Sequence, residues 1–199
     1  APAQAHPGDS AAQKDAAEVE ALARRLEIES AAGVAEALVA SSTDPDSPAA
    51  KGMLAMAADV RDGLIPVESI FAAADVNIEH GLQLVEPVLA AYAEATTPEE
   101  KQRLAREVRA APLKVTVLAA AMSGGSQPEA TAGLLRIVAD AVEGSLPFGA
   151  VEAVVEFVGD HGMGPLKEAA AAYKAAETPE DKQAAFRAVR AALLEVAAV

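Results

Sequence analysis

The segment TPEEKQ at residues 97–102 recurs, with one conservative change, as TPEDKQ at residues 178–183. The two copies stand 81 positions apart (178 − 97 = 81), and the same shift places residues 47–118 on residues 128–199 without a gap. Self-similarity at a fixed period is typical of one supersecondary unit built twice. We therefore predict a tandem duplication with a period of 81 residues.

The composition predicts that the fold is all-α. Alanine dominates the apolar residues, aromatic residues make up 3% of the chain, and tryptophan is absent. Alanine is the strongest helix former, whereas a sheet protein would need more β-branched and aromatic residues.

Each copy of the repeat carries apolar residues at the spacing of four helices joined by short turns. A further helix precedes the first copy and matches the long last helix of the unit more weakly, with Arg25 falling on Arg106 and Val34 on Val115. Short connections make neighbouring helices antiparallel. Either two helical bundles or a short α-solenoid would satisfy this pattern.

The chain divides into four parts. We expect a mobile N-terminal tail at residues 1–10, a leading helix with the first repeat at 11–122, a linker of sequence SGGSQP at 123–128, and the second repeat at 129–199. Serine, glycine and proline mark the linker because they favour turns and end helices.

The leading helix carries an apolar stripe at helical spacing, made by Val19, Leu22 and Leu26. We expect the helix to run over residues 11–28 and to resume after Gly33, since glycine weakens a helix interior.

Several helix ends carry the residues that favour them. Ser47 and Thr97 each precede a proline and are predicted N-caps, and Gly63 is a predicted left-handed C-cap. Glu100, three residues after Thr97, completes a capping box that recurs in the second copy.

The sharpest chemical signal is a pair of equivalent histidines, His80 and His161, each preceded by a carboxylate, Glu79 or Asp160. If the two pairs faced one cavity, they could hold a divalent metal ion, and the two imidazoles alone could ligate a haem. Alternatively they are helix ends, because histidine favours the last turn of a helix and a glycine follows each.

Tyr92 and Tyr173 are the only tyrosines, and they too are equivalent. Two interpretations remain open. Each could be half-buried with its hydroxyl at the surface, or each phenol could reach into a ligand cavity.

Arg103, Arg106 and Arg109 give one helix a basic side. In a chain this acidic we expect them to pair with carboxylates of neighbouring helices, and an anion site is the alternative.

The net charge of −14 argues against nucleic acid as a partner, because a phosphate backbone requires clustered basic residues. No apolar run approaches the length of a membrane span. The absence of cysteine excludes disulfides and cysteine nucleophiles. The small-residue start, APAQA, is consistent with a periplasmic or secreted protein, and a cytoplasmic location is the alternative.

No phosphate-binding glycine loop, zinc-protease motif or nucleophile elbow occurs in the sequence, and we assign no catalytic residue. The leading hypothesis is a non-enzymatic binding protein that holds a protein partner or an apolar small molecule at a surface or cavity between its two repeats. The first alternative is a metal or haem protein, which could be an enzyme, built on His80 and His161. The second is a structural component of a larger assembly. No cofactor is required by the sequence, and the oligomeric state is open.

Overall fold

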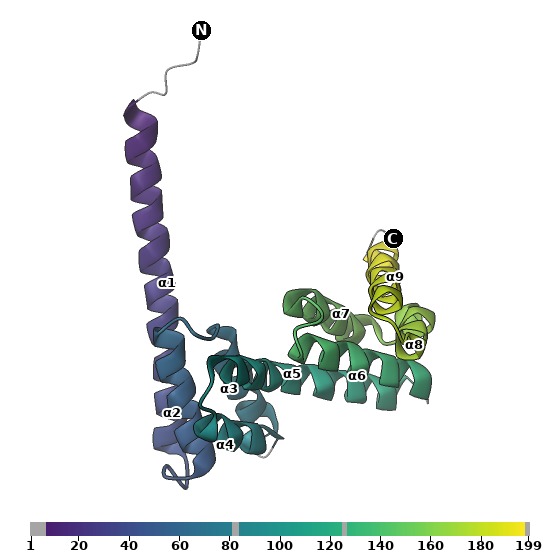
Figure 1. Cartoon of the computed structure of the whole chain (residues 1–199), viewed down its shortest axis with the longest axis horizontal. Coiled ribbons are helices and arrows are strands. Elements are labelled where there is room, and N and C mark those ends of the chain that lie inside the picture. Colours follow the sequence, from purple (N-terminus) through teal and green to yellow (C-terminus); the bar gives the residue numbers. More distant parts are fainter. Residues whose placement is uncertain (1–6, 81–83, 125–126, 198–199) are drawn as a thin grey trace.

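The computed structural model describes residues 7–80, 84–124 and 127–197, apart from the side chains of residues 7–12, 79–80 and 196–197. The elements it describes are all helical (Figure 1), as the composition predicts. In chain order they are α1 (Pro7–Ser41), α2 (Pro48–Arg61), α3 (Glu68–His80), α4 (Glu86–Glu94), α5 (Pro98–Ser123), α6 (Pro128–Val142), α7 (Phe148–His161), the short 3₁₀ helix η2 (Gly164–Leu166), α8 (Lys167–Ala175) and α9 (Pro179–Ala197).

Helix α1 is continuous and longer than the sequence suggests. It begins at Pro7, so residues 7–10 of the expected tail are helical, while residues 1–6 lie outside the described part of the chain. Gly33 does not interrupt it, because the residues around Gly33 are fixed by packing on α2 and α3. Its C-terminal half lies against the body of the protein, and its N-terminal half projects beyond the other helices (Figure 1).

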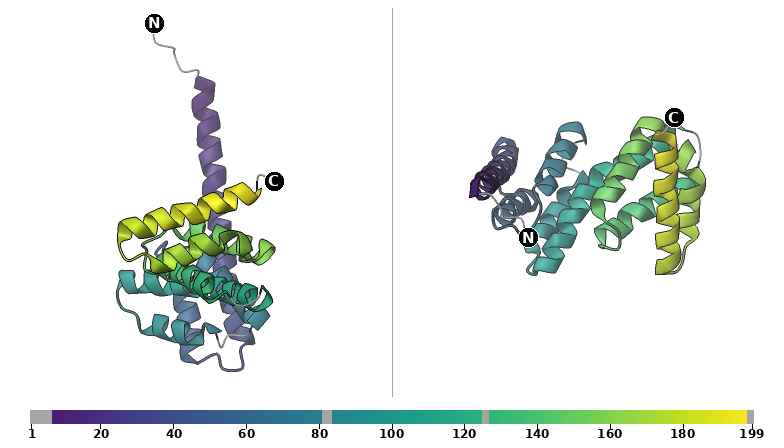
Figure 2. Two further views of the ribbon diagram at one scale, coloured as in Figure 1. Left: turned by 90° about the vertical axis from the view of Figure 1, so that its right-hand side faces the viewer. Right: turned by 90° about the horizontal axis from the view of Figure 1, so that it is seen from above.

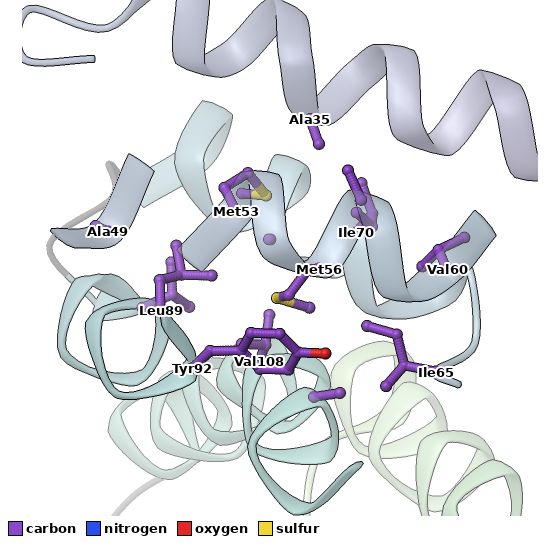
Figure 3. Packing of buried hydrophobic residues seen from close by; sticks show 14 of the residues in the cluster. Ala35, Ala49, Met53, Met56, Val60, Ile65, Ile70, Leu89, Tyr92 and Val108 are labelled. Atoms are coloured by element: carbon purple, nitrogen blue, oxygen red, sulfur yellow. The ribbon is translucent and has the colours of Figure 1, made fainter. Parts of the chain in front are cut away.

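The buried residues form two hydrophobic clusters, one in each half of the chain. The first includes Met53, Met56 and Tyr92, and Ala35 of α1 points into it on the side of Ile70 (Figure 3). Small alanine side chains let α1 approach α2 and α3 closely. The protein therefore builds its core from many close helix contacts rather than from large aromatic side chains.

Helix α5 belongs to both clusters. Leu104 and Val108 are buried in the first, whereas Ala110 and Val117 are buried in the second. The expected linker at 123–128 includes residues 125–126, which lie outside the described part of the chain, and the two clusters divide inside α5. The two halves are therefore joined by a common helix, which crosses from one to the other in Figure 1 and in the view from above in Figure 2.

Two glycines set the closest helix crossings. A Cβ atom on Gly52 of α2 would lie 1.8 Å from the backbone oxygen of Leu89 in α4, and one on Gly133 of α6 would lie 1.9 Å from the backbone oxygen of Ala170 in α8. Both distances are far below van der Waals contact. The two crossings occupy positions 81 residues apart (133 − 52 = 81; 170 − 89 = 81).

The turns that follow α2 and α6 are also equivalent. Gly63 and Gly144 adopt left-handed backbone angles, φ +72° and +82°. The amide of Leu64 donates to the carbonyl of Asp59, as the amide of Ser145 does to that of Asp140, both at 2.8 Å. This six-to-one bond is the signature of a Schellman motif, and it confirms the C-cap predicted at Gly63.

The predicted N-caps are present. The hydroxyl of Ser47 accepts from the amide of Ala50, and that of Thr97 accepts from the amide of Glu100. Matching contacts therefore recur in both halves, while the duplication itself stays a prediction.

Replacing Gly52 or Gly133 by alanine should destabilise the protein, because the new methyl group can only be accommodated by moving two backbones apart. We expect a loss of about 2 kcal/mol or more in the free energy of unfolding for each variant, measured by urea denaturation.

Gly33→Ala is the matched control, since a Cβ there has nothing within 4 Å and the residue is helical. It should be neutral or stabilising by up to about 1 kcal/mol. Equal effects at Gly33 and Gly52 would contradict the close-crossing interpretation.

Candidate functional site

Three polar residues of the first half meet at the edge of its hydrophobic cluster. The hydroxyl of Tyr92 in α4 donates to Oδ2 of Asp59 in α2 at 2.7 Å. The ammonium group of Lys101 in α5 lies 2.8 Å and 3.1 Å from the two carboxylate oxygens of the same aspartate. One carboxylate thus ties together three helices.

The second half repeats this arrangement atom for atom. Tyr173 in α8 donates to Oδ2 of Asp140 in α6 at 2.6 Å, and Lys182 in α9 lies 2.8 Å and 3.0 Å from the two oxygens of Asp140. We call these two sets the Asp–Tyr–Lys clusters: Asp59, Tyr92 and Lys101 in the first, and Asp140, Tyr173 and Lys182 in the second.

Both tyrosines are fully buried, which makes the half-buried interpretation wrong. Burial raises the pKa of the Tyr92 phenol well above its ordinary value, and the hydrogen bond to Asp59 raises it further. The pKa of Tyr173 is raised by burial and then by its bond to Asp140. A phenol held so firmly in its protonated form is a poor proton donor or nucleophile near neutral pH.

Each Asp–Tyr–Lys cluster therefore joins three helices. Burying a carboxylate requires partners for its oxygens, and each aspartate obtains a phenol and an ammonium group. Sequence reasoning placed Tyr92 and Tyr173 among candidate ligand-binding residues but did not connect them with Asp59 or Asp140. The signal was present, because the aspartate, the tyrosine and the lysine all recur at the 81-residue shift.

The predicted histidine site is only partly described. His161 and Asp160 are exposed at the C-terminal end of α7. The His161 ring stacks on Phe157 with centroids 4.4 Å apart, and its Nδ1 lies 3.3 Å from the Phe157 carbonyl oxygen. Gly162, at φ +75°, follows as the C-cap. These contacts are those of a helix end.

The side chains of Glu79 and His80 lie outside the described residues, so the pairing of His80 with His161 is not placed. Among the side chains that the structure describes, no three His, Asp or Glu residues come together in a cluster able to hold a metal ion. In the same part of the chain, no helix is long and apolar enough to cross a bilayer.

An open hollow lies beside the projecting part of α1. We call it the α1 groove; its volume is about 860 Å³, and it opens between α1 and the turn that joins α2 to α3. Ile28, Leu64 and Val67 line its apolar wall. The charged residues along it are Glu20, Arg24, Glu27 and Glu68.

The equivalent turn in the second half is covered. Nε of Arg106 in α5 donates to the carbonyl of Val142 at 2.6 Å. The Arg109 guanidinium lies 4.3 Å from the centre of the Phe148 ring and pairs with Glu152 at 2.7 Å. The expected pairing of the α5 arginines with carboxylates of neighbouring helices is thus correct for Arg109. Both arginines cover the α6–α7 turn, whereas α1 leaves the corresponding α2–α3 turn open.

Two further hollows lie in the second half. One, of about 540 Å³, is formed by the C-terminal parts of α5 and α7 and lined by small side chains such as Ala119 and Gly159. The other, of about 150 Å³, lies beside Tyr173 and Lys182. The three hollows thus each lie within one half, and the α1 groove combines the largest volume with an apolar wall and charged residues.

Tyr92→Phe and Tyr173→Phe should each destabilise the protein by about 1–3 kcal/mol, because a buried carboxylate loses its phenol donor. Urea denaturation measures the change. The two clusters lie in separate halves, so the losses should add in the double variant. A double variant as stable as the parent protein would show that the phenols do not hold these helices together.

Alkaline pH should destabilise the protein through the same phenols. Their pKa is raised in the folded state, so above about pH 10 the unfolded chain binds fewer protons than the folded chain. Stability is therefore retained below pH 10 and lost as the pH rises through the folded-state values. Tyrosinate absorbance near 295 nm should stay low in the folded protein at pH 11 and rise with a midpoint near pH 10 in guanidinium. Coincident titration curves would contradict the burial argument.

Comparisons with known proteins found no match to this chain. No protein-family model matches it, and neither does any curated protein or solved structure.

Proposed function

We propose that the protein is a non-enzymatic interaction protein that binds an amphipathic, net basic helix of a protein partner in the α1 groove. The single observation that carries this proposal is the open groove beside the α2–α3 turn, at a place where the second half of the molecule is closed by its own arginines.

The chemistry of the groove selects the partner. Its apolar wall suits the apolar face of a helix, which is the usual occupant of a groove of this kind. Three glutamates face one arginine among its charged residues. This excess of negative charge favours a partner whose polar face carries lysine or arginine.

The tyrosines support a binding role over a catalytic one. Tyr92 and Tyr173 are bonded to carboxylates and held protonated, which suits the joining of helices. The α1 groove, by contrast, is open and holds charged side chains that can meet a partner.

Three expectations from the sequence remain predictions beside this proposal. A metal or haem protein based on His80 and His161 would show bound metal or a visible absorption band after purification, and both would disappear in the variant His80→Ala/His161→Ala. A structural component of a larger assembly would form a defined high-order oligomer. Fractionation of cells that express the protein would distinguish a periplasmic or secreted location from the cytoplasmic alternative.

The groove proposal predicts binding of a fluorescein-labelled 14-residue peptide that is helical, with leucines on one face and lysines on the other. Fluorescence anisotropy should show saturable binding by the full chain. The variant Glu20→Lys/Glu27→Lys/Glu68→Lys should weaken it at least about tenfold, because it reverses the charge of the groove.

The matched control is Glu156→Lys/Glu168→Lys/Glu180→Lys, which changes the net charge equally at exposed positions in the second half. It should retain most of the affinity. Equal losses in both variants would show unspecific charge attraction, and unsaturable binding would contradict the groove. Displacement of the peptide by a neutral apolar dye, with no dependence on the glutamates, would favour an apolar small molecule instead.

A further inference from the structure

The projecting half of α1 carries an apolar stripe that no described part of the protein covers. Val19 is 68% exposed, Leu22 56% and Leu26 63%. Residues 13–27 are exposed throughout, whereas Ala31 and Ala35, further along the same helix, are fully buried. We define Val19, Leu22 and Leu26 as the α1 stripe.

The α1 stripe points away from the body of the protein and from the α1 groove. At about 100° per residue, it lies roughly opposite Ala31 and Ala35 around the helix axis, and about 130° from Glu20, Arg24 and Glu27. Figures 1 and 2 show this half of α1 standing clear of the other helices. A second helix can therefore run along the stripe without meeting the body or filling the groove.

The charges beside the stripe select the direction of that second helix. Glu18 and Arg25 are seven residues apart, so they lie on the same flank of the stripe, while Ala16 and Ala23 lie on the other flank. In a parallel pair of helices each flank meets the opposite flank of the partner. In an antiparallel pair each flank meets its own counterpart.

Only the antiparallel arrangement pairs these charges. With Leu22 of one copy against Leu22 of the other, Glu18 meets Arg25, Arg25 meets Glu18, and Val19 lies near Leu26. On the other flank Ala23 lies near Ala23 of the partner copy, and these small side chains permit close approach. In a parallel pair the charged residues would face alanines.

We propose that two copies of this chain associate through their α1 stripes as antiparallel helices about a two-fold axis beside Leu22. Each copy contributes three apolar side chains and two ion pairs form. Asp15 of each copy also faces Glu29 of the other, whose carboxylate pairs with Arg61, so the dimer is weak. Its dissociation constant should be of micromolar order, about 1–100 µM. Because the groove lies on another face of α1, the dimer would present two grooves, and its failure would leave the groove proposal intact.

The experiment is sedimentation equilibrium of the full chain between 1 and 300 µM, with circular dichroism to verify folding. The parent chain should form a dimer. Glu18→Arg and Arg25→Glu should each weaken it at least about tenfold by bringing like charges together, and Glu18→Arg/Arg25→Glu should restore the affinity to within about threefold. A parent chain that is monomeric at 300 µM overturns the proposal. So does a double variant that is no better than the single ones.

Cross-linking provides a second test, because the chain has no cysteine. Leu22→Cys should form a disulfide-linked dimer under mild oxidation, since the two-fold axis brings the two copies of this position together. Leu194→Cys, at a position 66% exposed in α9, is the control. Equal rates of cross-linking in the two variants overturn the two-fold arrangement.

Discussion

The architecture depends on α5 being one continuous helix that enters two hydrophobic clusters. At about 1.5 Å per residue, its 26 residues extend over about 39 Å, and its buried residues are divided between the two clusters. Leu104 and Val108 therefore pack in the first half, and Ala110 and Val117 in the second. The shared helix α5 thus joins the two halves. Side chains on its other faces, including Arg106 and Arg109, then reach across to the α6–α7 turn and close it.

Around this shared helix, each half is stabilised by two different kinds of contact between helices. A glycine lets two helix backbones touch, at Gly52 and at Gly133, and a buried carboxylate ties together three helices, at Asp59 and at Asp140. The glycine contact increases dispersion attraction between the two backbones and leaves no space for a Cβ atom on the glycine. The carboxylate contact is directional, because the carboxylate must keep both its phenol partner and its ammonium partner. Together they explain how a chain with few aromatic residues specifies its packing.

Helix α1 takes the place in the first half that α5 takes in the second, but only its C-terminal part is covered. The N-terminal part therefore has an exposed apolar stripe on one face and lines the α1 groove, rich in glutamate, on another. The candidate site residues whose side chains the structure describes are engaged elsewhere. His161 stacks on Phe157 at a helix end, and the tyrosines are bonded within the core.

The amino-acid sequence alone determined the features that depend on composition and on residues near one another in the chain. Alanine content determined the helical class, the caps at Ser47, Thr97 and Gly63 followed from side-chain and backbone preferences over a few residues, and the 81-residue shift paired the positions of the two halves. Tertiary structure decided the rest. Whether a tyrosine is buried, whether Gly33 breaks a helix, and whether Val19, Leu22 and Leu26 are covered all depend on residues distant in the chain. Helical periodicity shows that a face is apolar, but only the packing of the other helices determines whether anything lies against it.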